Sequence, residues 1–151
     1  LIDWQFDPVT FGYSPANLSK AISKGHEVSL DWRGGWGFLR ANWTKIQALN
    51  DATGLWLVRR AQKTSNVTLG TDFGDLHIES QMWVVGQRFD DAGNTKLLDK
   101  YKTIDIRIAY AWNETWKLNG RIENLKDVKY EEAAGYSVAG RSTYAGVSAT
   151  F

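Results

Sequence analysis

The chain has 151 residues, and its 18 lysines and arginines against 17 aspartates and glutamates leave a formal net charge of only +1. This balance argues against a nucleic-acid-binding protein, and the absence of cysteine excludes disulfides, thiolate chemistry and cysteine metal sites. No apolar run approaches the ~20 residues of a membrane helix, whereas 8 Trp, 6 Tyr and 6 Phe suit the aromatic girdles of a membrane barrel or an aromatic-rich binding surface.

Alternating apolar and polar residues predict strands along most of the chain, because successive side chains of a strand point to opposite faces. Residues 8–19, which hold both prolines, are expected to form a loop. Gly34-Gly35 predicts a two-residue turn. In chain order, the predicted strands are 1–7, 21–33, 36–48, 57–73, 76–89, 101–112, 116–125 and 141–151.

The connections between these strands sort by length. Short turns are predicted around Gly34, Asp72 and Asn113, and all of them fall on one edge of an antiparallel sheet. Such sorting is typical of outer-membrane barrels, and a β-sandwich has no reason to show it. The long loops on the opposite edge are 8–19, 49–56, 90–98 and 126–140.

The last predicted strand favours the same interpretation. Its alternate positions from Thr143 to Phe151 become apolar toward the end, while the other face is small and mostly polar. Chain termini usually fray, but the last strand of a membrane barrel must pair, and an aromatic residue suits the water–lipid boundary.

The strand at 101–112 predicts the orientation of the sheet. Ile104, Ile106 and Ile108 share one face and are expected to contact lipid, whereas Asp105 and Arg107 are expected to face a polar lumen. Aromatic residues lie close to the short-turn edge, as an interfacial girdle would. They are Trp32, Trp36, Phe73, Tyr110, Trp112, Trp116 and Phe151.

Motifs near the C-terminus carry a resemblance to a known family. Asn124-Leu125-Lys126-Asp127, then Gly135-Tyr136 and Gly140-Arg141 before the final strand, resemble the C-terminus of TonB-dependent outer-membrane transporters. The resemblance spans the chain and looks closest to the cobalamin-transporting members. Further matches are Leu1-Ile2-Asp3-Trp4, Lys24-Gly25-His26-Glu27, Leu57-Val58-Arg59-Arg60-Ala61 and Gly86-Gln87-Arg88-Phe89-Asp90.

This resemblance implies an all-β fold: a transmembrane β-barrel segment of about eight antiparallel strands, with short periplasmic turns and long extracellular loops. The family's barrel has 22 strands and a plug. Residues 1–151 would then be the C-terminal part of such a barrel, with the chain beginning partway through a longer protein and the plug absent. The expected location is the bacterial outer membrane. Expected partners are lipid and lipopolysaccharide, the missing strands and plug, TonB through the missing N-terminal part, the barrel assembly machinery through the last strand, and cobalamin or a siderophore, but no nucleic acid.

The resemblance also implies where substrate binds. Arg59, Arg60 and Tyr136 are expected to contact substrate at the extracellular mouth, and Arg141 is expected to anchor its loop. No catalytic residue, metal site or cofactor is expected, so the chain is not expected to be an enzyme. His77 and Glu79 alone do not make a metal site, and residues 90–94 lack the further ligands that an all-oxygen calcium site needs.

Three alternatives to cobalamin transport stay open at this level. The first is a TonB-dependent receptor for an iron-siderophore. The second is a small barrel that closes on itself, with structural or adhesive function, in which residues 3–6 would pair with residues 147–151. The third, an outer-membrane barrel enzyme, would need a serine or carboxylate site that the sequence does not suggest.

Overall fold

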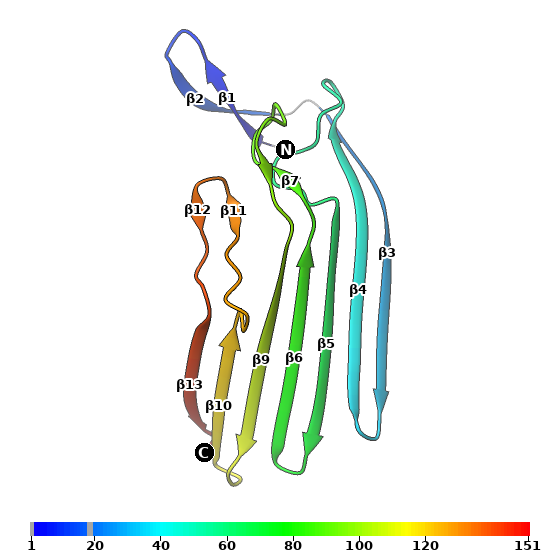
Figure 1. The fold of residues 1–151 in the computed structure, drawn as a ribbon, viewed down its shortest axis with the longest axis vertical. Coiled ribbons are helices and arrows are strands. Elements are labelled where there is room, and N and C mark those ends of the chain that lie inside the picture. Colours follow the sequence, from blue (N-terminus) through cyan, green and yellow to red (C-terminus); the bar gives the residue numbers. More distant parts are fainter. Residues whose placement is uncertain (1, 18–19) are drawn as a thin grey trace.

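The computed structural model describes residues 2–17 and 20–151. Within them, seven strands form one antiparallel sheet, in the order β13-β10-β9-β6-β5-β4-β3 (Figure 1). These strands are β3 (Ala21–Gly34), β4 (Gly37–Asn50), β5 (Lys63–Phe73), β6 (Leu76–Val85), β9 (Tyr101–Ala111), β10 (Trp116–Glu123) and β13 (Ser142–Ala149). Among the described residues, no helix is long and apolar enough to span a membrane.

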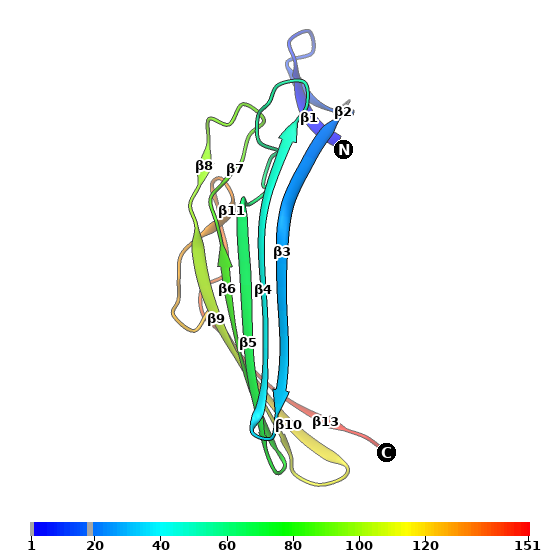
Figure 2. The ribbon, with the colours of Figure 1, turned by 90° about the vertical axis from the view of Figure 1, so that its right-hand side faces the viewer.

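The predicted sorting of the connections is confirmed. The turns β3–β4, β5–β6 and β9–β10 lie together at the lower end in Figure 1, and the long connections lie at the upper end. The β5–β6 turn uses Gly74 at φ 57°, a left-handed conformation that glycine adopts without a Cβ penalty. In the β9–β10 turn, the Asn113 side chain accepts hydrogen bonds from the backbone N–H groups of Thr115 and Trp116. The side view shows a curved and twisted sheet (Figure 2).

Three small hairpins lie at the long-loop end, and they correct the predicted loops. β1 (Ile2–Asp7) pairs with β2 (Gly12–Asn17), so the prediction of an unstructured loop over 8–19 is wrong for residues 12–17. The Asp7 carboxylate closes this hairpin by accepting hydrogen bonds from the Val9 N–H and the Thr10 hydroxyl. Leu1 and residues 18–19 lie outside the described residues. The other hairpins are β7 (Arg88–Phe89) with β8 (Leu97–Leu98), and β11 (Glu131–Ala133) with β12 (Tyr136–Ser137).

Two predicted strands are too long. The strand predicted over 57–73 begins only at Lys63, because Arg59 adopts φ 56° and its N–H donates to the Phe89 carbonyl instead of a ladder partner. The strand predicted over 76–89 leaves the sheet after Val85, and β7 then pairs with β8. Alternation continues through both regions in the sequence, so it could not show where the ladder ends.

The pairing that would close the chain on itself is absent from the described strands. β1 pairs with β2 and not with the last strand, while β3 and β13 each pair on one side only. Seven of the eight predicted strands thus lie in this sheet, and the first, predicted over residues 1–7, pairs with β2 outside it. The alternative of a small self-closed barrel gains no support from this topology.

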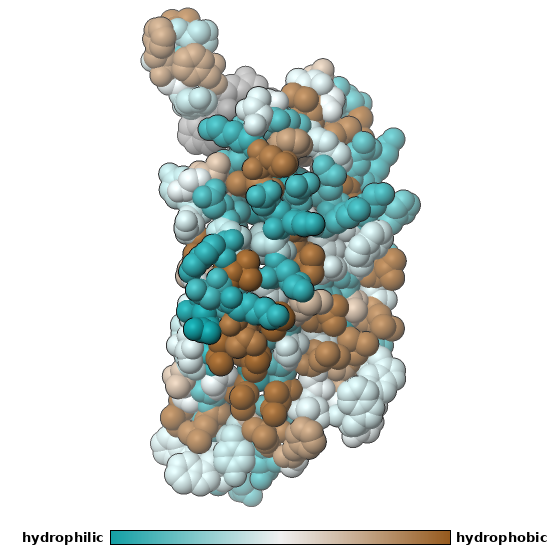
Figure 3. All heavy atoms as spheres, in the orientation of Figure 1, coloured by the Kyte–Doolittle hydropathy of each residue, from teal (hydrophilic) through white to brown (hydrophobic). Residues whose placement is uncertain are grey.

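The register separates an apolar from a polar face, because cross-strand partners share a face. Ile106 is opposite Ser80 on β6 and Ile122 on β10, and Ile104 is opposite Met82. Apolar side chains gather over the lower part of the sheet in Figure 3, above pale aromatic residues at the short turns. The polar face carries the ion pairs Asp31–Arg40, Glu79–Arg107, Arg121–Glu123 and Asp72–His77.

The predicted aromatic residues lie at the short-turn end, and most of their side chains are exposed. Trp32 packs against Trp36 with ring centroids 4.8 Å apart, and Trp116 meets Phe151 edge-on at 6.4 Å. Exposed aromatic side chains just beyond an apolar band are typical of a membrane–water boundary.

Candidate functional site in the long-loop cluster

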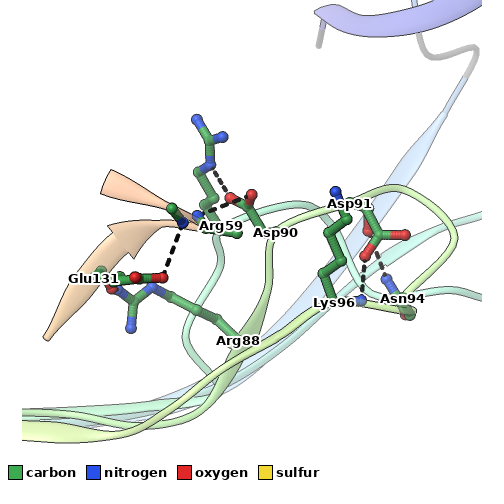
Figure 4. Close-up of polar contacts among 9 residues, drawn as sticks. Arg59, Arg88, Asp90, Asp91, Asn94, Lys96 and Glu131 are labelled. Carbon is green, nitrogen blue, oxygen red and sulfur yellow. Dashed lines mark hydrogen bonds and ion pairs between the residues drawn. The ribbon is translucent and has the colours of Figure 1, made fainter. Parts of the chain in front are cut away.

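Three connections from different parts of the chain meet at the long-loop end of the sheet. They are residues 51–62, residues 86–100 and residues 124–141, and the hairpins β7–β8 and β11–β12 belong to them. Polar side chains tie these connections to one another, as Figure 4 shows for the centre of the cluster. The sequence-predicted binding residues Arg59, Arg60 and Tyr136 all lie in these connections.

Asp90 is the hub of this cluster. Its Oδ1 atom accepts a hydrogen bond from Arg59 Nε at 2.5 Å, and its Oδ2 atom accepts one from the Ala134 N–H at 3.1 Å (Figure 4). The Asp90 side chain is only 12% exposed. One carboxylate thus joins residues 51–62 to the β11–β12 hairpin, and charge-assisted hydrogen bonds of this kind are stronger than neutral ones.

The pKa of Asp90 is lowered from its usual value. The main cause is the hydrogen bond from the Arg59 side chain. The Ala134 N–H and the charges of Arg59 and Lys96 act in the same direction, while burial opposes them. Asp90 is therefore ionised at neutral pH, and the ionised form holds the loops together.

This shift predicts how the cluster responds to acid. A lowered pKa means that the stabilisation is complete above the ordinary aspartate pKa of ~3.9 and is lost as the pH falls through the lowered value. We expect the protection of the Ala134 amide against hydrogen exchange, corrected for the intrinsic rate, to be flat above about pH 5 and to fall below about pH 4. Loss of protection already near neutral pH would contradict this assignment.

Arg59 is fixed by its backbone as well as by its side chain. It adopts φ 56°, and its N–H donates to the Phe89 carbonyl oxygen at 2.7 Å. Its side chain is 55% exposed, and the end of its guanidinium group extends away from Asp90 in Figure 4. Arg59 therefore anchors its loop through Nε and still presents terminal N–H donors to solvent.

Arg60 and Tyr136 have fewer constraints. Arg60 is exposed, and among the described residues no hydrogen bond or ion pair to its side chain is found. Tyr136 is 76% exposed and begins β12, two residues after Ala134. The structure thus joins the loop of Arg59 to the hairpin of Tyr136 through Asp90, although 77 positions separate the two residues in the sequence.

Arg88 and Asn94 reinforce the cluster, and sequence reasoning missed both of them. Arg88 is 5% exposed, its Nη2 atom donates to the Glu131 carbonyl at 2.7 Å, and its guanidinium lies over the Tyr101 ring. Asn94 bonds both the N–H and the carbonyl of Trp56, at 2.7 and 3.0 Å. Arg88 fell within the strand predicted over 76–89, and Asn94 fell within residues 90–94, which were weighed only as a calcium loop, so neither was predicted to brace the connections.

Residues 91–96 form a hydrogen-bonded turn. The Asp91 carboxylate accepts hydrogen bonds from the N–H groups of Thr95 and Lys96, which close the turn. His77 pairs with Asp72 at 2.7 Å, and Glu79 pairs with Arg107 at 2.9 Å. In the part of the chain that the structure describes, no group of three or more potential ligands could hold a metal ion.

The C-terminal motif residues brace the third connection. The Asn124 side chain, which is 5% exposed, accepts from the Val128 N–H and donates to its carbonyl, both at 2.9 Å. Asp127 Oδ1 accepts a hydrogen bond from the Arg141 N–H at 2.8 Å and pairs with Lys129. The Arg141 N–H is the first cause that lowers the pKa of Asp127. Arg141 thus holds its loop through its backbone.

Comparison with known proteins agrees with this architecture. A family model described as TonB dependent receptor-like, beta-barrel, matches residues 1–125. The vitamin B12 transporter BtuB of Photobacterium profundum is 28% identical over 131 residues, which are 87% of this chain and 22% of that protein. The chain therefore spans about a fifth of the length of this curated relative.

Solved structures share the fold at lower identity. The ferric yersiniabactin uptake receptor FyuA of Yersinia pestis superposes with a TM-score of 0.74 at 16% identity, over 91% of this chain and 25% of that one. The copper transporter OprC superposes with a TM-score of 0.76 at 17% identity, over 99% of this chain and 27% of that one.

Proposed function

Since this chain belongs to the TonB-dependent receptor β-barrel family, a family of the bacterial outer membrane, we propose that it serves TonB-dependent uptake of cobalamin. The chain supplies barrel wall, lumen lining and extracellular loops. The observation that carries the choice of substrate is the 28% identity to a vitamin B12 transporter over 87% of the chain.

The open sheet supports a role as one part of a larger barrel. The unpaired outer sides of β3 and β13 need partners, because an exposed strand edge cannot face hydrocarbon. Further strands of the same transporter would supply them, and the plug and the contact with TonB would lie outside this chain. The barrel assembly machinery would engage β13.

The two faces of the sheet fit a barrel wall. Ion pairs and exposed polar side chains on one face suit a wet lumen that holds a plug, and the apolar face suits lipid. A hollow of about 430 Å³ on the polar face is lined by His77, Glu79, Arg107, Arg121 and Tyr144, among others. We assign this face to the lumen.

The long-loop cluster supports the assignment of the binding residues. Asp90 couples the loop that carries Arg59 to the hairpin that carries Tyr136, so both side chains belong to one braced surface at the extracellular end. Arg59 offers guanidinium donors, Tyr136 offers a ring and a hydroxyl, and Arg60 adds a second exposed cation. A large ligand with many polar groups suits such a surface.

Cobalamin binding to the full-length transporter in detergent tests this proposal. Loss of one hydrogen bond typically costs ~0.5–1.5 kcal/mol, so Arg59→Ala and Tyr136→Ala should each weaken binding roughly threefold to tenfold. Lys117→Ala, on β10 near the short turns, is the control and should leave the affinity unchanged.

Three outcomes would change the assignment. Unchanged affinity in both Arg59→Ala and Tyr136→Ala would remove these residues from the site. Binding of a ferric siderophore without any binding of cobalamin would keep the family and replace the substrate. A variant at Asp90 that loses as much affinity as Arg59→Ala would show that Arg59 acts by positioning its loop.

A further inference from the structure

In the seven described strands, the apolar face of the sheet carries basic residues but no acidic ones. Every aspartate and glutamate of the seven-stranded sheet lies on the polar face, by alternation and register. The apolar face carries no carboxylate in these described strands, and its four lysines and one histidine all lie toward the long-loop end. They are Lys24, His26, Lys45, Lys63 and Lys102.

Four of these residues form one compact group, which we call the basic patch: Lys24, His26, Lys45 and Lys63. The register places Lys45 directly opposite His26 on one side and directly opposite Lys63 on the other. Lys24 lies two residues before His26 on β3, on the same face and opposite Gln47. All four side chains are exposed, and the described residues provide no ion pair to any of them.

Lys45 and Lys63 are like charges directly opposite each other, which destabilises a sheet, and an anion bound between them removes this cost. The basic patch also borders a hollow of about 440 Å³, which the loop residues Trp56 and Gln62 help to line. The space and the donors therefore suit a phosphate-sized group attached to a larger molecule.

The position of the basic patch restricts the kind of anion. The next pair below it is Val28 opposite Trp43, and Trp43 is 40% exposed. Below that pair, Leu30 and Ala41 begin the apolar band. Polar side chains cover the upper part of the sheet and apolar ones the lower part in Figure 3. An anion at the basic patch would lie at the level of lipid headgroups, just above an interfacial tryptophan.

We propose that the basic patch binds the phosphate groups of lipopolysaccharide in the outer leaflet, on the outside of the barrel. The inference rests on the proposed orientation, with the apolar face toward lipid, and is independent of the substrate that the barrel carries. Lysine heads lie over the apolar band on flexible stems, which lets them reach phosphates at slightly different heights. Each lysine near an anionic membrane surface strengthens binding, and the effect weakens with salt.

Binding of diphosphoryl lipid A to the full-length transporter in detergent tests this site. Lys45→Gln with Lys63→Gln should weaken binding at least ~tenfold at low salt, and Lys45→Arg with Lys63→Arg should preserve it. The matched control, Lys117→Gln with Lys126→Gln, removes the same charge from the polar face and a loop, and should bind as the wild type does. Fully dephosphorylated lipid A should bind weakly to all four proteins.

Two further measurements distinguish loss of the lipid site from loss of the fold or of cobalamin binding. Cobalamin binding in the same preparations should be unchanged, and a gel-mobility shift on heating would confirm that each variant is a folded barrel. Equal lipid A binding by the Lys45→Gln, Lys63→Gln variant and the wild type would overturn the site. Inorganic phosphate that competes at millimolar concentration would assign the basic patch to a free anion instead of a lipid and would also overturn the proposal.

Discussion

Replacing Ile106 with arginine should strongly impair folding of the full-length transporter into lipid bilayers. Ile106 lies in the middle of β9, opposite Ser80 and Ile122, on the face that we assign to lipid. Arginine at the bilayer midplane costs ~2–4 kcal/mol on the lipid face of a barrel. The neighbouring variant Arg107→Ala changes the opposite face, where Arg107 pairs with Glu79 at 2.9 Å.

The comparison of these two variants is informative because the two positions are adjacent on β9 and lie on opposite faces of the sheet. The Arg107 side chain is 47% exposed, and surface ion pairs contribute little to stability, so its loss should have a small effect. Folding yield into lipid vesicles, read from the gel-mobility shift on heating, measures both variants against the wild type. Equal yields for Ile106→Arg and Arg107→Ala would reverse or remove the orientation that we assign to the sheet.

The sequence predicted the sheet well where the alternation of side chains between the two faces of a strand dominates. The alternation of Ile104, Ile106 and Ile108 with Asp105 and Arg107 shows a strand with two unlike faces, and β9 runs from Tyr101 to Ala111, one residue short of the predicted end at 112. Turn residues such as Asn113 also act locally. The order of the seven sheet strands along the chain and the sorting of the loops follow from these short-range signals.

The same reasoning could not find the braces of the long-loop cluster. Asp90 acts on Arg59, 31 positions earlier, and on Ala134, 44 positions later. Arg88 reaches Glu131 across 43 positions. Nothing in the spacing of polar residues in irregular segments indicates which of them will meet, because the folded sheet brings their strand ends together. The β1–β2 hairpin was missed for a related reason, since Pro15 argued against a strand, although a two-stranded hairpin leaves each strand one free edge.

Replacing Asp90 with alanine should loosen two loops at once. The substitution removes the acceptor for both Arg59 Nε and the Ala134 N–H, and the Asp90 side chain is only 12% exposed. Loss of hydrogen bonds to a charged group costs about 1–3 kcal/mol, so local opening should become roughly tenfold to hundredfold more frequent. Hydrogen exchange at the amides of Ala134 and Arg59 reports on the two loops separately.

Asp91→Ala provides the matched control, because it removes a carboxylate of the same length at the adjacent position. Among the described residues, the Asp91 side chain bonds only within its own turn, to the N–H groups of Thr95 and Lys96 and the Thr95 hydroxyl. We expect this variant to accelerate exchange at Thr95 and Lys96 while the amides of Ala134 and Arg59 stay protected. If Asp90→Ala also affected only the turn over 91–96, Asp90 would not be the hub, and the loops that carry Arg59 and Tyr136 would move independently. Cobalamin binding would then require each loop to be ordered by the ligand itself, at a cost in affinity that the braced arrangement avoids.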